Sequence, residues 1–205
     1  MEEIRWKSLD EVRDEASVCC RCDLCHGRTH VVFGEGPPGA RALIVGEGPG
    51  REEDETGRPF MGRAGEYLNE LLARAGVDRD SLWITNIVRC RPTISRNGLV
   101  DNRAPKGAEI RACDIWTSAT YRFVNPEIVM CLGGAPAQIL IHKSFRVDDD
   151  RGVWHEGREG KLTAATYHPA YVQRFGGENR RIMEELMIED FRMLRSKMEE
   201  LRKAA

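Results

Sequence analysis

The stretch ALIVGEGPGREEDETGRPF, from Ala42 to Phe60, decides the expected architecture. Its apolar start, Ala42–Glu47, predicts a strand, and the glycine-rich turn that follows is crowded with carboxylates. Turns at the carboxyl ends of strands in open α/β sheets usually form ligand sites. The carboxylates would repel phosphate, and Arg51 stands where a dinucleotide fingerprint has its third glycine. We therefore expect a neutral ligand and a carboxylate for chemistry; a solvated acidic loop is the alternative.

The alternation of strand and helix patterns continues along the chain. Short apolar runs predict further strands at Leu82–Val88, Glu127–Leu132 and Lys161–Tyr167. Helical patterns occupy Gly62–Ala75, Lys106–Phe123, Ala135–His142 and Asn179–Leu201. This order predicts an α/β fold in which right-handed crossovers join parallel strands and helices cover both faces of the sheet. No repeat or linker divides the chain, so we expect a single domain over residues 1–205.

Two segments carry predictions of their own. Arg91–Pro105 is rich in Gly, Pro and Asn, and its length predicts an irregular loop that is functional or mobile. The surrounding Arg89–Arg111 region has six basic residues against two acidic ones, so a solvated loop and a phosphate-contacting one are both open. A minor strand is expected at Val153–His155, paired with the segment after it.

Bulk composition gives few constraints. The 205 residues are 41% hydrophobic and 31% charged with a net charge of −2, as in an ordinary globular protein. No apolar run approaches the roughly 20 residues of a membrane span. The opening MEEIRWKSLDEV lacks the basic and apolar segments of a signal peptide. We expect a cytoplasmic protein with no membrane association.

Seven cysteines in a cytosolic chain are not expected to form disulfides. Four have positions that make sense together: a C-x-x-C pair, one cysteine directly after a predicted strand, and one in the next helix. These are Cys19, Cys22, Cys90 and Cys113. Tetrahedral thiolate ligation suits zinc or an iron–sulfur cluster, and spacing does not choose between them. Cys20 and Cys25 complicate the count, because Cys22 and Cys25 form a second C-x-x-C, and Cys131 is expected in the core.

Three more signals lie at or near predicted strand ends. The Asn86 amide suits bidentate reading of a ligand, although an asparagine there is more often structural. His168, held before Pro169, suits a neutral imidazole that stabilises a developing anion. Phe60 follows Arg58-Pro59 and is apt for the core or for stacking on a planar ligand. Together with the carboxylates, these residues suit the recognition and detachment of a nucleobase.

Six motifs occur in order and cover most of residues 19 to 175. They are GRTHVVFGEG (27–36), LIVGEGPGREEDETGRPFMGRAGEYL (43–68), ITNIVRCRP (84–92), NRAP (102–105), LGGAPA (132–137) and YHPAYVQR (167–174). As an ordered set they resemble the family 4 uracil-DNA glycosylases, the iron–sulfur branch of that superfamily found in bacteria and archaea. The resemblance implies a three-layer α/β/α domain with a central four-stranded parallel sheet, and a C-terminal helix over residues 178–205.

The resemblance also assigns residues to roles. It places a [4Fe-4S] cluster on Cys19, Cys22, Cys90 and Cys113, within residues 19–113. It implies that Glu47 and Gly48 line the uracil pocket and position water. Of the acidic pair beyond them, Glu53 is expected to be catalytic and Asp54 to contact the substrate. It further implies that Phe60 stacks on uracil, Asn86 reads it and His168 is the catalytic histidine. Phosphate contacts are expected from Arg91, Arg103 and Arg174.

The implied reaction is hydrolysis of the bond between uracil and deoxyribose in single- or double-stranded DNA. The base is flipped into the pocket, and His168 donates to uracil O2 as charge moves onto the base. Water is oriented by a carboxylate or a backbone carbonyl of the Glu47–Glu53 turn, and Glu53 is expected to exclude thymine. The segment Ala170–Arg174 is expected to fill the gap in the helix. A monomer is expected, with a sliding clamp or a polymerase as candidate partner.

The chain departs from the family pattern in two places. TISRNGLVD is inserted before the NRAP motif, and Val172-Gln173 stand where the family often has leucines. Three rival hypotheses remain: a non-catalytic uracil-DNA-binding or polymerase-associated domain, an iron–sulfur electron carrier, and a zinc-stabilised nucleotide hydrolase. The insertion is also reminiscent of relatives that capture uracil-DNA covalently through a histidine, but this loop has none.

Overall fold

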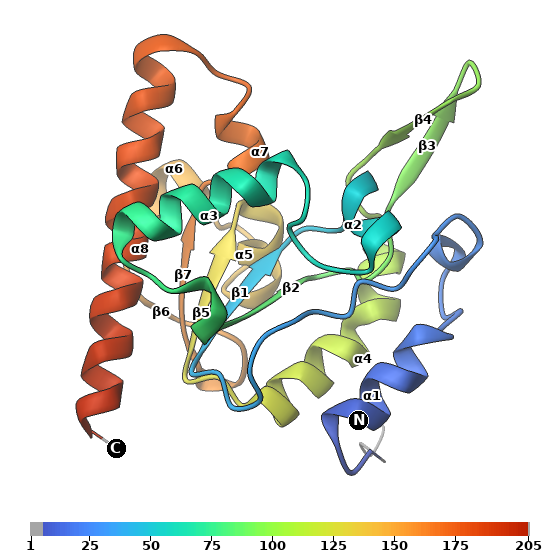
Figure 1. Ribbon diagram of the computed structural model, residues 1–205, viewed down its shortest axis with the longest axis horizontal. Helices are drawn as coiled ribbons and strands as arrows, with labels where there is room; N and C mark the ends of the chain where they lie inside the picture. Colours follow the sequence, from blue (N-terminus) through green and yellow to red (C-terminus); the bar gives the residue numbers. More distant parts are fainter. Residues whose placement is uncertain (1–5, 205) are drawn as a thin grey trace.

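A five-stranded sheet forms the centre of the computed structural model, which describes residues 6–204 (Figure 1). Its strands are β1 (Ala42–Gly46), β2 (Leu82–Asn86), β5 (Ile128–Leu132), β6 (His155–Glu156) and β7 (Leu162–Thr166), in the order β2-β1-β5-β7-β6. Strands β2, β1, β5 and β7 are parallel neighbours, which confirms the predicted four-stranded parallel sheet. The short β6 adds an antiparallel edge and overlaps the expected minor strand at one residue.

Helices cover both faces of the sheet, because each central strand is buried on both sides. Along β1, Leu43 and Val45 join one core, and Ala42 and Ile44 join the other, as the alternation of a strand requires. The first core packs under α1 (Leu9–Ser17), α4 (Gly107–Val124) and α5 (Gly134–Leu140). The second packs under α3 (Arg63–Ala75) and α8 (Gly177–Ala204), and α8 is the expected C-terminal helix (Figure 1).

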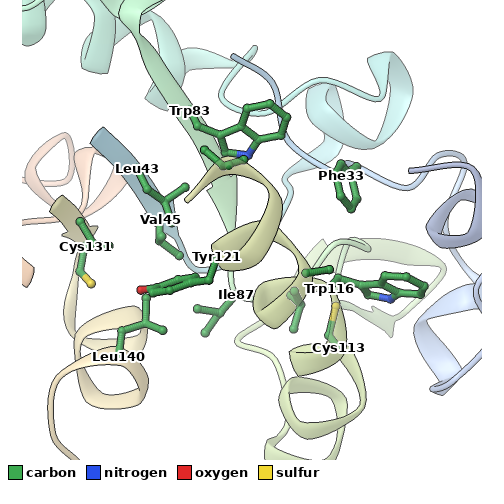
Figure 2. Packing of buried hydrophobic residues seen from close by; sticks show 14 of the residues in the cluster. Phe33, Leu43, Val45, Trp83, Ile87, Cys113, Trp116, Tyr121, Cys131 and Leu140 are labelled. Atoms are coloured by element: carbon green, nitrogen blue, oxygen red, sulfur yellow. The ribbon is translucent and has the colours of Figure 1, made fainter. Parts of the chain in front are cut away.

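The first core is built around large aromatic side chains. Figure 2 shows Trp83 and Tyr121 among the aliphatic residues of β1 and α5, with Trp116 and Cys113 along α4. Cys131 lies on β5 and is fully buried, so it has the position of a small core residue, as predicted. Short helices complete the chain at α2 (Arg51–Thr56), α6 (Val147–Asp150) and α7 (Pro169–Val172).

The prediction of an irregular Arg91–Pro105 loop was wrong. This segment forms a hairpin of β3 (Thr93–Arg96) and β4 (Leu99–Asn102), which projects from the body of the molecule (Figure 1). Its turn residues, Asn97 and Gly98, have φ values of 51° and 77°. Two positive φ values suit a type I′ turn, for which Asn-Gly between strand-forming residues is the strongest short-range signal. The hairpin could therefore have been predicted from Asn97-Gly98 and the residues on either side.

No helix in the described part of the chain is long and apolar enough to cross a membrane.

Candidate active site and metal centre

A cleft lies at the carboxyl ends of the parallel strands. The turn after β1, the last residue of β2, the loop after β5 and the loop after β7 all contribute to its wall. Because parallel strands end at the same edge of the sheet, they bring together residues that are far apart in the sequence. Of the predicted site residues, the cleft is lined by Glu47, Gly48, Glu53, Phe60, Asn86, Arg103, His168 and Arg174. Asp54 and Arg91 are not among its lining residues.

The ring of Phe60 and the amide of Asn86 meet over Gly46. A Cβ added at Gly46 would lie 2.4 Å from Asn86 Oδ1 and 2.6 Å from Phe60 Cζ, so only glycine leaves room for both groups. The Asn86 side chain is 2% exposed, and we find no hydrogen bond from its amide to another described residue. A buried amide without a protein partner at a cleft wall is available to a ligand.

Phe60 is held in an unusual backbone conformation. Its φ of 55° is rare for a residue with a side chain. Gly65, in the first turn of α3, makes this possible, since a Cβ there would lie 1.8 Å from the Phe60 carbonyl oxygen. Backbone strain of this kind concentrates at functional sites. The conformation turns the ring toward His168, with 6.2 Å between the two ring centroids.

His168 has a fixed tautomer. Its Nδ1 accepts a hydrogen bond from the backbone N–H of Ala170 at 3.1 Å. The proton of the neutral ring must therefore sit on Nε2, which is left as a donor. Burial, assisted by the nearby Arg174 charge, lowers the pKa of His168 to about 4. The imidazole is accordingly neutral at physiological pH.

Glu47 lines the cleft at the start of the acidic turn and is partly buried. Burial raises the pKa of Glu47, and the Arg174 guanidinium opposes that rise. The Glu47 backbone carbonyl accepts a hydrogen bond from Val88 N at 3.4 Å, whereas its carboxylate has no hydrogen-bond partner within the described residues. Water is predicted to be oriented by a carboxylate or a backbone carbonyl of the Glu47–Glu53 turn, and the Glu47 carboxylate is one of these groups.

Glu53 holds two turns together. Its Oε1 accepts hydrogen bonds from Met61 N and Gly62 N, both at 2.9 Å, and its Oε2 accepts one from Gly50 N at 2.9 Å. Both oxygens of this buried carboxylate are thus bound to the backbone on either side of the α2 helix. These contacts give Glu53 a positioning role, which fixes Phe60 and the Gly48–Gly50 turn relative to each other.

Three other predicted residues have internal partners. Asp54 accepts the Thr29 N–H with both carboxylate oxygens at 3.0 Å. Arg103 donates to Glu109 through two nitrogens, at 2.8 and 2.6 Å, and to Thr93 O at 2.9 Å. It thereby anchors the base of the β3–β4 hairpin to α4. Arg91 donates to Asn102 Oδ1 at 2.6 Å through Nε alone.

Tyr171 and Arg63 also line the cleft; Tyr171 was predicted only as part of the Ala170–Arg174 segment, and Arg63 was not predicted. Tyr171 is 42% exposed and stacks on Tyr167, with 6.3 Å between centroids, whereas the neighbouring Val172 is fully buried. Arg63 lies at the rim as the first residue of α3, and nothing in the pattern distinguished it from other surface arginines.

A second, smaller cavity brings together the four predicted ligand cysteines. Cys19, Cys22, Cys90 and Cys113 line it with Arg28, Arg89 and Trp116, whereas Cys20 and Cys25 do not. Burial raises the pKa of Cys90 to about 12 and that of Cys113 to about 11. Thiols in such an environment become thiolates only beside positive charge or metal.

The donor set is four thiols around one cavity. Four cysteines are the ligand number of a structural zinc site and of a [4Fe-4S] cluster. Among the described residues, no three His, Cys, Asp or Glu side chains converge closely enough to hold one metal ion. Hydrogen-bond donors already face the sulfurs: Arg89 N lies 3.2 Å from Cys113 Sγ, and Arg28 Nη1 lies 3.5 Å from Cys90 Sγ. Such contacts are typical around thiolate-held clusters.

Comparison with known proteins gives consistent matches. The family model described as the uracil DNA glycosylase superfamily matches residues 33–192, which include the whole cleft. The chain is 38% identical over 183 residues to the type-4 uracil-DNA glycosylase of Thermotoga maritima, covering 88% of this chain and 92% of the relative. Type-4 uracil-DNA glycosylases of Sulfurisphaera tokodaii and Archaeoglobus fulgidus are 34% and 35% identical. They cover 92% and 81% of this chain, and 84% and 83% of their own lengths are matched.

Proposed function

The chain belongs to the uracil-DNA glycosylase superfamily, and we propose that it is a DNA-repair enzyme that hydrolyses the bond between uracil and deoxyribose. The product is an abasic site in DNA. The observation that carries this proposal is the neutral His168, which lines the same cleft as Phe60 and Asn86 and keeps its ring proton on Nε2. Uracil needs an aromatic ring to stack on, an amide to bind its polar edge, and a neutral donor for the charge that it gains as it leaves.

Uracil binding follows from Phe60 and Asn86. Flipping the base out of the helix costs a few kcal/mol, and stacking on an aromatic ring offsets part of this cost. The Phe60 ring supplies that stacking surface, and the unpartnered Asn86 amide forms hydrogen bonds with the polar edge of uracil. Both groups lie against Gly46, so the stacking surface and the hydrogen-bonding amide are held close together.

Bond cleavage leaves negative charge on the departing base. His168 donates Nε2–H to uracil O2, and backbone N–H groups near Gly48 assist it. A preorganised donor of this kind contributes about 3–4 kcal/mol to transition-state stability. The Glu47 carboxylate orients the water that attacks C1′ of the sugar. A positioned but weakly solvated carboxylate suits this role.

Glu53 acts through the backbone it binds. By fixing Met61 and Gly62 against Gly50, it places bulk beside the base and keeps the Phe60 ring in position. We assign the exclusion of thymine to the loop that contains Met61 and Gly62, which Glu53 holds in place. Asp54 has the corresponding role toward Thr29, and contact of Asp54 with the substrate remains a prediction.

DNA contacts are assigned around the cleft mouth. Arg174 is exposed at the rim, and Arg91 keeps both terminal nitrogens free for phosphate. Arg103 was predicted for the same role, but its donors are occupied by Glu109 and Thr93, so we assign it to holding the hairpin. Tyr171 is the exposed aromatic residue of the Ala170–Arg174 segment and is the one we assign to filling the gap left by uracil. Binding to phosphates makes the affinity salt-dependent.

The four cysteines are assigned as ligands of a [4Fe-4S] cluster. When bound, the cluster supplies a covalent cross-link between the N-terminal segment, the residues after β2 and α4. This cross-link fixes the Arg28–His30 segment, whose Thr29 N–H binds Asp54 beside the cleft. We further propose a monomeric cytoplasmic enzyme; sliding-clamp or polymerase contacts remain predictions.

The decisive experiment is glycosylase activity on a labelled oligonucleotide with a single uracil. Alkali cleaves the abasic product, and an oligonucleotide with thymine at the same position is the control. We expect cleavage at uracil alone. A protein that binds uracil-DNA, contains iron and cleaves neither substrate would overturn the enzymatic assignment in favour of a binding or capture role.

A further inference from the structure

Arg89 is a buried arginine with an incomplete set of partners. It follows β2, directly precedes Cys90, and is 1% exposed. Its Nη2 donates to Thr120 Oγ1 at 3.2 Å. The remaining two guanidinium nitrogens, Nε and Nη1, are buried without a hydrogen-bond partner in the described part of the chain. Buried donors are rarely left unpaired, so these two require an explanation.

The Arg89 charge also lacks a counter-charge. The nearby Asp114 carboxylate is bound by Arg158, and no described carboxylate forms an ion pair with Arg89. The Phe33 ring lies 5.9 Å from Arg89 Cζ, a weak cation–π contact. An unpaired buried charge is strongly destabilising, and an apolar residue of similar size would serve the fold better.

The cysteine cavity can supply the negative charge that Arg89 lacks, once its four thiols are deprotonated as ligands. Arg89 lines it together with all four cysteines, and its backbone N–H already donates to Cys113 Sγ. Arg28 lines it as well and reaches Cys90 Sγ. Four thiolates around a [4Fe-4S] core carry net negative charge, and a cation buried nearby interacts with it more strongly than an exposed one.

We propose that Arg89 is the buried counter-charge of the cysteine-held cluster, retained because it stabilises the anionic cluster rather than the fold. This inference rests on the cluster assignment of the proposed function. Arg28 acts on the same cluster from the solvent side, while Arg89 supplies the charge that water and salt do not screen. A cation stabilises the more negative, reduced form, so removing it lowers the midpoint potential of the cluster.

The test compares three substitutions in the iron-loaded protein. Arg89→Met removes both the charge and the side-chain hydrogen-bond donors. Arg89→Gln removes the charge but keeps a donor group, and Arg89→Lys keeps the charge. Arg158→Met is the matched control, because Arg158 is a partly buried arginine bound to α4 with its own carboxylate partner. The readouts are iron per protein, the rate of iron release to a ferrous chelator, and the midpoint potential.

We expect Arg89→Met and Arg89→Gln to release iron about tenfold faster or more, as loss of outer-shell partners does at metal sites. Both should have a lower midpoint potential, Arg89→Lys should recover most of the effect, and Arg158→Met should match the parent protein. Release rates and potentials of Arg89→Gln equal to those of the parent would overturn the proposal. If the parent protein contains no iron, the cluster assignment is wrong and the Arg89 proposal fails with it. This outcome is independent of whether the protein has glycosylase activity.

Discussion

The backbone N–H of Ala170 donates to Nδ1 of His168 at 3.1 Å, across the turn that begins α7. The bond can form only when Nδ1 carries no proton, so it selects the neutral tautomer with hydrogen on Nε2. Pro169 fixes the geometry of this turn through its restricted φ. Burial and the nearby Arg174 charge keep the ring neutral, and this local hydrogen bond sets the tautomer of the proposed catalytic donor.

Replacing His168 with alanine should remove the donor and leave the binding surface. We expect a loss of about 10²- to 10³-fold in single-turnover excision, the usual effect of deleting one preorganised donor. Binding of uracil-containing DNA should change little, because Phe60 and Asn86 remain. Single-turnover kinetics and fluorescence anisotropy measure the two quantities, and unchanged excision would remove His168 from the mechanism.

The low pKa of His168 makes the stability of the protein depend on pH. Its folded-state pKa is about 4, below the ordinary value of 6.5, so the unfolded chain binds the proton more readily. The associated stability is fully present above pH 6.5 and is lost as the pH falls toward 4. In His168→Gln this contribution is absent. We expect a smaller drop in Tm between pH 7 and pH 4.5 in the variant than in the parent protein; equal drops would contradict the assignment.

Gly46 is predicted to be intolerant of even one methyl group. Gly46→Ala places a Cβ 2.4 Å from Asn86 Oδ1 and 2.6 Å from Phe60 Cζ, so the amide or the ring must move. Overpacking of this kind costs about 1–3 kcal/mol of unfolding free energy. The loss in kcat/KM should exceed that expected from stability alone, since both uracil contacts shift. Urea unfolding and steady-state assays measure the two effects.

Gly176→Ala is the control for this substitution. No atom lies within 4 Å of the position that its Cβ would take, and Gly176 does not have a positive φ. Activity and stability close to those of the parent protein are expected. An active, fully stable Gly46→Ala would show that the ring and the amide do not define the pocket.

The sheet and the cleft could be predicted because they depend on local patterns. Apolar runs located β1, β2, β5 and β7, and parallel topology then placed Asn86 and His168 at one edge. The hairpin was missed because the Arg91–Pro105 segment was interpreted from its Gly, Pro and Asn content. Asn97-Gly98 between Ile94 and Val100 was the overlooked signal.

Local sequence patterns could not predict the roles of the acidic and basic residues. Glu53 and Asp54 are adjacent, yet their oxygens bind backbone groups on different segments, at Met61 and at Thr29. Arg103 is bound by Glu109, six residues later, on a different element. Such partners depend on tertiary placement, because each carboxylate or guanidinium binds whichever groups the folded chain brings near.

Tyr171 should matter more for duplex DNA than for single strands. Tyr171→Ala removes the exposed ring that we assign to the gap in the helix, while the buried Val172 stays in place. Aromatic–base stacking contributes about 1–3 kcal/mol, so the Kd for a uracil duplex should rise roughly tenfold. The Kd for a single-stranded oligonucleotide should change less, and Tyr171→Phe should bind like the parent protein. Equal effects on both DNA forms would exclude the wedge role.

Cys90 tests whether the cysteine cavity holds the cluster. Cys90→Ser removes one of its four predicted ligands, so we expect colourless protein with little iron and a lower Tm, because the cross-link to the N-terminal segment is lost. Cys25→Ser is the matched control: Cys25 lies near the same connector but outside the cavity lining, and its variant should stay brown. Visible absorbance, iron analysis and thermal melts measure these outcomes. A brown and fully stable Cys90→Ser would exclude Cys90 as a ligand, and loss of colour in Cys25→Ser would place Cys25 in the ligand set.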